Sequence, residues 1–283
     1  MIKLSERTIE KINNDNELEY TNEKAYKLKL FLKKINNELL NHEVIINNKF
    51  IKLWAKNILT KKDITNFIIQ FSVFSNQFLI AQLQKVINSD TLEAARESKE
   101  ILANEIGVIF KSKRKLDELY NNDIDSNLVS TKGSVDGGTY RFSAAHFEWI
   151  YKIAKKLDLK YNDIGRRCHG YKSTLYFCDK LIQLYGGSNY NIALACSYAI
   201  ENWAAAGFWK ELIHGLKKYN STTDDKLPLS FFIWHDKIED QHAEHTQEEL
   251  EEIYFTKKIN EDEFIEYGNK MLDAVLVFWD GML

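Results

Sequence analysis

The scarcity of proline is the feature that most restricts what this chain can fold into. Pro228 is the one proline among 283 residues, and only 12 glycines accompany it. Folds rich in β-strands need many tight turns, and tight turns draw on Pro and Gly. Hydrophobic residues recur at the spacing of one helix face along most of the chain. The sequence therefore predicts an all-α protein built from long helices.

Capping residues help to locate these helices. Asp90 and Ser188 fit N-cap positions, and Pro228 fits the first turn of a helix that begins there. Residues 1–20 are polar and are expected to be loosely attached. The periodicity predicts helices at residues 22–41, 43–58, 63–88, 90–110, 140–157, 171–185, 188–218, 228–255 and 260–281.

One polar stretch, residues 111–139, breaks the helical pattern and carries Gly133, Gly137 and Gly138. Loops of this length are usually functional or mobile. We interpret this stretch as an excursion or lid and not as a domain linker. The helices on both sides have apolar faces that need a partner, so we expect one helical domain over residues 1–283.

The overall charge and the cysteine content exclude several classes of protein. The formal net charge is −3, with no basic excess for nucleic acid or an anionic membrane. The N-terminus lacks a signal-peptide core, and no run approaches the 18 apolar residues of a membrane span. Cys168, Cys178 and Cys196 form no CxxC pair, and an odd count indicates reduced thiols. We therefore expect a cytoplasmic protein.

The segment from His235 to His242 carries the strongest chemical signal. On a helix, Glu239 lies about 40° from His235, and His242 lies about 20° to its other side. Two imidazoles and one carboxylate thus project from one narrow stripe. That ligand set suits Fe(II) with open positions for O₂.

Three further polar residues, Glu105, His146 and Glu201, stand where an apolar side chain would be expected. Burying a carboxylate without a partner costs several kcal/mol, and a metal ion removes that cost. Their helical neighbours are hydrophobic: Ile101, Leu102 and Ile109 for Glu105; Phe142, Trp149, Ile150 and Ile153 for His146; and Tyr198, Ala204, Ala205 and Phe208 for Glu201.

Together these residues make three carboxylates and three imidazoles on four predicted helices. Helical di-iron proteins project such a set into the core of a bundle. The six candidate metal ligands are Glu105, His146, Glu201, His235, Glu239 and His242.

At this point the chain resembles the haem-oxygenase-like di-iron oxidases and oxygenases, which include the CADD-like proteins. The likeness is carried by Asn-Glu-Ile-Gly around Glu105, Ala-His-Phe-Glu-Trp around His146, Ile-Glu-Asn-Trp around Glu201, and the triplet of His235, Glu239 and His242. It covers roughly residues 65–255. The chain departs from the family pattern in two places. Forty residues lie between Glu105 and His146, and Glu239 stands where many relatives carry Asp.

The resemblance implies a haem-oxygenase-like up-down bundle of about seven core helices, a fold shared with TenA and pyrroloquinoline-quinone synthase. It also implies two non-haem irons, O₂ as co-substrate, and often a homodimer. Family reactions include N-oxygenation of amines and oxidative C–C cleavage of amino acids or fatty acids. We therefore expect an oxidoreductase that acts on a small amine, amino acid or carboxylate.

Two alternatives from other classes stay open. A metal-free enzyme similar to thiaminases would use a cysteine nucleophile, and Cys196 lies shortly before Glu201. Such a thiolate needs a lowered pKa or a nearby base. A non-catalytic interaction module, as CADD-like proteins were first viewed, would instead use the helix surfaces and residues 111–139.

The substrate pocket can be predicted only in outline. The aromatic candidates to line it are Tyr198, Trp203, Phe208, Trp209, Phe231, Phe232 and Trp234. The cationic candidates to bind a substrate carboxylate are Arg141, Arg166, Arg167, Lys172 and Lys210.

Overall fold

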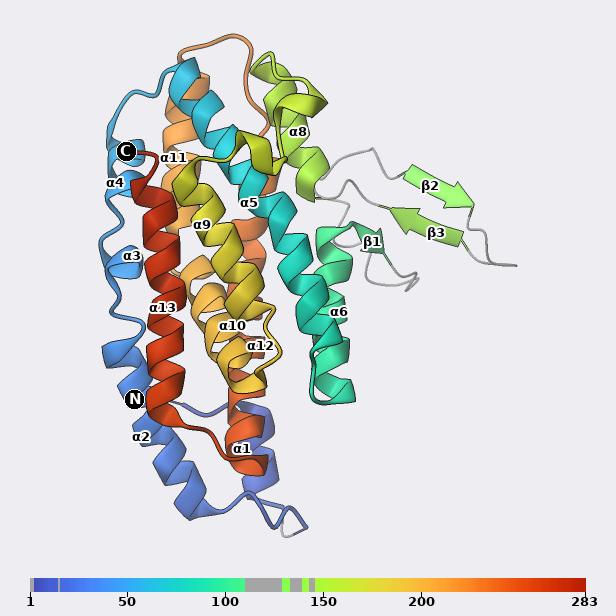
Figure 1. The fold of residues 1–283 in the computed structure, drawn as a ribbon, viewed down its shortest axis with the longest axis vertical. Helices are drawn as coiled ribbons and strands as arrows, with labels where there is room; N and C mark the ends of the chain where they lie inside the picture. The colour runs from blue at the N-terminus through green and yellow to red at the C-terminus, as the bar shows by residue number, and fades with distance from the viewer. Residues whose placement is uncertain (1–2, 15, 110–128, 133–138, 143–145) are drawn as a thin grey trace.

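The structure, a computed structural model, describes residues 3–14, 16–109, 129–132, 139–142 and 146–283. Within these ranges, the side chains of residues 93, 97, 104, 108–109, 129–132, 139–142 and 238–242 lie outside the description. The described part is an elongated helical bundle with a small β-sheet at one side (Figure 1). The predicted helical bundle is confirmed. The single-domain organisation stays a prediction.

The longer described helices are α2 (Asn22–Glu38), α5 (Lys61–Ile87), α6 (Leu92–Glu105), α10 (Tyr190–Ala204), α11 (Phe208–Ser221), α12 (Ser230–Thr256) and α13 (Glu261–Asp280). The shorter ones are α1 (Glu6–Ile12), α3 (Glu43–Ile46), α4 (Lys49–Lys56), α8 (His146–Lys156) and α9 (Lys172–Lys180). A π-helical turn, Leu181–Tyr185, continues α9, and the 3₁₀ turns Tyr161–Asp163 and Arg167–His169 precede it.

Side-chain caps determine where several helices begin. Thr60 caps α5 in a capping box: its hydroxyl accepts from the Asp63 amide, and the Asp63 carboxylate accepts from the Thr60 amide at 2.9 Å. The predicted caps at Asp90 and Ser188 are each one residue early. Thr91 caps α6 by accepting from the Ala94 amide, and Asn189 caps α10. Because the neighbouring residues also have oxygen-bearing side chains, sequence alone could not separate them.

Helix α10 lies at the centre of the bundle, against α12 and α13. Every residue from Ala193 to Glu201 is buried, so this helix is covered on all sides. The two long neighbours run along the same axis of the bundle (Figure 1). A carboxylate on α10 is therefore held in the interior whichever way it faces.

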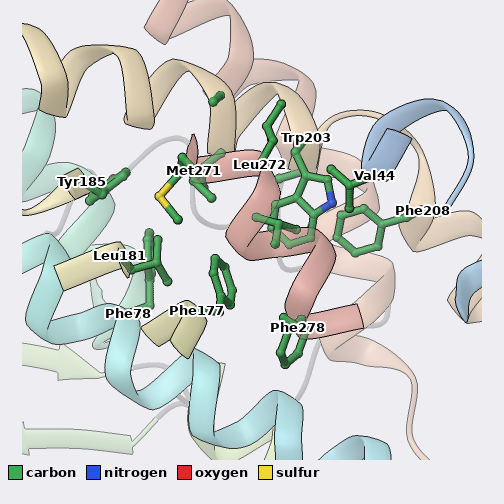
Figure 2. Packing of buried hydrophobic residues seen from close by; sticks show 14 of the residues in the cluster. Val44, Phe78, Phe177, Leu181, Tyr185, Trp203, Phe208, Met271, Leu272 and Phe278 are labelled. Carbon is green, nitrogen blue, oxygen red and sulfur yellow. The ribbon is translucent and has the colours of Figure 1, made fainter. Parts of the chain in front are cut away.

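Aromatic side chains fill much of the core around α10. Phe177 of α9 lies with its ring centroid 5.4 Å from that of Phe278 of α13, and these two rings lie between α9 and α13 in Figure 2. Phe74 of α5 packs against both rings, with its centroid 4.9 Å from that of Phe177 and 5.8 Å from that of Phe278. Full burial of one such ring stabilises the fold by about 1.5–3 kcal/mol. These contacts hold α5, α9 and α13 in fixed positions around the interior.

Helix α5 has the length and composition to cross a membrane, the one such helix among the described residues. In this fold it is a core helix, because 61% of its most apolar window is buried inside the protein. Its buried residues include Phe67, Phe71 and Phe78, which face other helices of the bundle.

A three-stranded antiparallel sheet lies beside α6 and α8 and was not predicted (Figure 1). Strand β3 (Thr139–Phe142) lies between β1 (Val108–Ile109) and β2 (Val129–Lys132), with Val108 opposite Phe142 and Lys132 opposite Thr139. The helix predicted from residue 140 consequently begins at His146. The rest of the predicted excursion, residues 110–128 and 133–138, lies outside the described residues, so its role as a lid stays a prediction.

Two predicted helices are each divided in the structure. The span 188–218 becomes α10 and α11, separated at Gly207, whose φ of +87° favours glycine. The span 43–58 becomes α3 and α4, separated at Asn47 and Asn48. Asn48 then caps α4 by accepting from the Ile51 amide at 3.1 Å.

Candidate metal centre

Glu105 reaches the bundle interior from the last position of α6. Helix α6 stops there because Gly107 turns the chain with a φ of +72° and leads into β1. The side chain of Glu105 is 15% exposed, so its carboxylate is mostly removed from solvent. The C-terminal end of α6 thus places one carboxylate, that of Glu105, in the interior.

His146 lies at the first position of α8 and is buried. Its Nδ1 lies 3.0 Å from Oε2 of Glu105. That contact lacks the direction of a hydrogen bond, and no other described residue gives Nδ1 a partner. Two polar atoms at close range without a hydrogen bond between them are arranged like ligands that face a common third atom.

His235 is buried on α12 with its ring orientation fixed. Its Nδ1 lies 2.7 Å from the carbonyl oxygen of Phe231 and must donate, because a carbonyl can only accept. The neutral ring then carries an unprotonated Nε2. Trp209 stacks on the ring at 4.7 Å. A backbone carbonyl that holds one nitrogen of a histidine is the usual second partner of a metal-binding imidazole.

These three side chains meet at one point. One ligand atom from each of Glu105, His146 and His235 lies within 4.8 Å of the other two. With bonds of about 2.0–2.2 Å, two donors of one zinc-like ion lie no more than about 4.4 Å apart. The observed spread is a few tenths of an ångström wider, which small side-chain rotations close.

Glu201 of α10 is buried and lines the same cavity as these three residues. The cavity measures about 70 Å³, enough for a few waters or small ligands. Apart from Ser75, its other walls are apolar: Phe71, Phe74, Phe78, Ile101, Ile200, Trp203, Ala204, Trp209 and Phe231. Two carboxylates and two imidazoles in an apolar wall form a donor set that fits a first-row transition metal.

The two remaining predicted ligands, Glu239 and His242, lie on α12 beyond His235. The helix is continuous through these positions, so the three residues share one face of it. Their side chains lie outside the described residues, and their metal binding stays a prediction.

Only some of the predicted pocket residues line the cavity. Trp203, Trp209 and Phe231 line it, whereas Tyr198, Phe208 and Phe232 do not. Trp234 also does not line the cavity, but its ring packs against that of His146, with 4.5 Å between the centroids. None of the cationic candidates whose side chains are described lines the cavity: Arg166, Arg167, Lys172 and Lys210 are exposed. Arg167, for example, forms an exposed ion pair with Asp179 at 2.7 Å.

The wall that α5 contributes to the cavity was not predicted; it consists of Phe71, Phe74 and Phe78. These residues follow the three- and four-residue spacing of a helix face, which is also the pattern of an ordinary core helix. Nothing in the sequence distinguishes a phenylalanine beside a metal from one beside another phenylalanine.

Cys196 does not have the surroundings of a nucleophile. It is fully buried, and its Sγ donates to the carbonyl of Tyr267 on α13 at 3.5 Å. Burial raises its pKa to about 12, whereas a reactive thiolate needs a lowered pKa. It is also absent from the lining of the cavity. These features argue against the thiaminase-like alternative.

No family model and no curated protein matches this chain. Solved structures do match it. A TenA homologue from Pseudomonas syringae superposes with a TM-score of 0.59 and 12% identity, over 89% of this chain and 92% of that one. A CADD-like protein of unknown function from Nostoc punctiforme matches with a TM-score of 0.58 and 16% identity, over 91% and 97%.

A third structure, from Shewanella denitrificans, is a domain of unknown function described as having a heme oxygenase-like fold. Its TM-score is 0.55 at 17% identity, over 90% of this chain and 91% of that one. At such identities the likeness concerns the course of the backbone and not the chemistry. The chain has the haem-oxygenase-like fold, which it shares with TenA homologues and CADD-like proteins.

Proposed function

We propose that this protein is a non-haem di-iron oxidase or oxygenase that uses O₂ to oxidise a small molecule. The ligands would be Glu105, His146, Glu201, His235, Glu239 and His242. One observation carries the proposal: Glu105, His146, Glu201 and His235, from four separate helices, line one small cavity whose walls are otherwise almost entirely apolar. Iron bound by carboxylates and imidazoles with open positions supplies O₂ activation.

The residues around the cavity prepare it for this chemistry. The Phe231 carbonyl accepts from Nδ1 of His235, so Nε2 is the nitrogen that would bind a metal, and Trp209 stacks on the ring and restrains it. The rings of Phe71 and Phe74 help to exclude bulk water from the interior. A dry site strengthens electrostatic interactions and limits side reactions.

The proposed substrate is a small amine, amino acid or carboxylate that undergoes N-oxygenation or oxidative C–C cleavage. No lysine or arginine occurs among the described residues that line the cavity. The substrate therefore brings an apolar part against the phenylalanines, and any charged group it carries must bind iron or point away. The proposal includes a cytoplasmic homodimer with no nucleic-acid or membrane partner.

The test is O₂ consumption by protein that has been loaded anaerobically with Fe(II) and then desalted. We expect rapid uptake by the unaltered protein and only the background of free Fe(II) for His235→Ala and Glu201→Gln. His245→Ala and Glu148→Gln are the matched controls, since both residues are exposed. They should retain full uptake. Equal uptake by all five proteins would refute the proposal.

A further inference from the structure

Trp234 is a residue beside the metal cavity to which the proposed function gives no role. Its indole packs against both imidazoles of the candidate centre, with ring centroids 4.5 Å from that of His146 and 5.0 Å from that of His235. Trp234 does not line the cavity itself. The indole therefore touches two proposed metal ligands from outside the space that a substrate would occupy.

Trp234 is also partly exposed, unlike the ligands that it touches. His146 and His235 are 4% and 7% exposed. Phe231 packs against the same two imidazoles, at 6.0 Å and 4.2 Å, but it is 2% exposed. The indole of Trp234 thus extends from the buried ligand rings to the solvent. It is a short connection between the metal centre and the surface.

The chemistry of indole gives this connection a meaning. Tryptophan and tyrosine are the aromatic side chains that lose one electron most easily, and phenylalanine is far more resistant. A centre that has reacted with O₂ is a strong oxidant, and without a substrate it can damage its own ligands and the surrounding core. An indole in contact with the ligands can give an electron to the centre before such damage occurs.

Proton loss determines which indole holds the oxidised state. An indole that has lost one electron is a much stronger acid at Nε1, and it is trapped as a neutral radical once water takes the proton. Trp209 stacks on His235, but its Nε1 is buried with no acceptor among the described residues. Trp149, 5.8 Å from both Trp234 and His146, has a similarly enclosed Nε1. Trp234 is partly exposed, so water can take its proton.

We propose that Trp234 is the exit for oxidising equivalents from the metal centre when no substrate reacts. Trp234 loses one electron to the O₂-oxidised centre through its contacts with His146 and His235, and its Nε1 proton passes to water. A small external reductant such as ascorbate then returns one electron and one proton, which restores the indole. The inference rests on the proposed function, because the oxidant is the metal centre after its reaction with O₂.

The test is the reaction of Fe(II)-loaded, desalted protein with O₂ in the absence of substrate, with catalase present to remove free peroxide. O₂ uptake is recorded, rapidly frozen samples are examined by electron paramagnetic resonance, and aged samples are examined by peptide mass spectrometry. We expect a tryptophan radical signal, followed by oxygen addition to the indole of Trp234 in excess of that at Trp209 and Trp149. Ascorbate should suppress both.

Trp234→Phe and Trp279→Phe are the matched pair of variants. Both keep an aromatic ring, but Trp279 is fully buried, and in the described part of the chain its ring packs against none of the proposed ligands. Trp234→Phe should lose the radical signal, and its O₂ uptake should stop after fewer turnovers, because oxidation then reaches His146 or Trp149. Trp279→Phe should keep the radical signal and the oxidation of Trp234.

The outcomes distinguish this inference from the proposed function. O₂ uptake without oxidation at Trp234, or a radical signal that persists in Trp234→Phe, would overturn the inference and leave the proposed function standing. Equal oxidation of Trp234 in His235→Ala protein would assign the oxidant to free iron and would also overturn the inference. Absence of O₂ uptake by the unaltered protein would overturn both.

Discussion

A double substitution, Glu105→Leu with His146→Phe, separates a metal centre from a structural ion pair. The two side chains are 15% and 6% exposed, and their polar atoms lie 3.0 Å apart. Replacing a buried pair by apolar groups of similar volume is neutral or stabilises a protein by about 1–4 kcal/mol. Without metal, we therefore expect the double variant to be at least as stable as the unaltered protein.

With metal bound, the unaltered protein should become more stable than the double variant. An ion at 100 times its dissociation constant stabilises the folded state by about 2.7 kcal/mol, and only the unaltered protein can bind it in full. The assay is urea unfolding followed by helical circular dichroism under anaerobic conditions, with and without Fe(II). Glu105→Leu alone is the control, since it leaves a buried imidazole without its close partner and should be less stable than the double variant. Equal stabilisation of both proteins by Fe(II) would refute the reasoning.

Three further predictions concern the fold and the thiols. Phe232→Ala should lower the free energy of unfolding by about 3–5 kcal/mol, because the ring is fully buried in the core. Thr60→Ala should lower it by about 0.5–2 kcal/mol through loss of the α5 cap. Iodoacetamide at about pH 8 should label Cys168 alone in the native protein, as read by mass spectrometry. Cys168 is exposed, whereas burial raises the pKa values of Cys178 and Cys196 to about 12, so only about one in 10⁴ of these thiols is ionised.

Each of these has a simple control. Leu18→Ala, at a side chain that is 85% exposed, should leave stability nearly unchanged. Thr65→Ala removes a half-buried threonine inside α5 and should cost less than loss of the cap. Labelling of Cys196 as fast as Cys168 would contradict its burial. A similar loss for Phe232→Ala and Leu18→Ala would contradict the packing of the core.

The helical fold could be predicted because proline scarcity and helix-face periodicity act over long stretches. The points at which two of the predicted helices are divided were harder to predict. Apolar periodicity continues past Gly207, so the separation of α10 from α11 depends on the backbone angle of one residue. The short strand β3 was missed because four residues, Thr139–Phe142, are too few for a periodicity of two to stand out.

The candidate site was predictable where a polar residue stood among apolar neighbours. That rule selected Glu105, His146 and Glu201, and the structure brings all three to the cavity that His235 lines. The rule fails for apolar walls, because a phenylalanine in a pocket looks like one in the core. It also fails for exposed cationic residues such as Arg167, because a positive charge does not indicate whether a side chain faces the cavity or the solvent.

Anomalous diffraction at the iron absorption edge, from crystals soaked anaerobically in Fe(II), tests the central claim most directly. The account predicts two peaks in the cavity lined by Glu105, His146, Glu201 and His235, about 3.5–4 Å apart as in two-metal sites generally. The same soak of His235→Ala crystals should lose at least one of them. A cavity without an iron peak at full soak, or peaks only on the protein surface, would contradict the account.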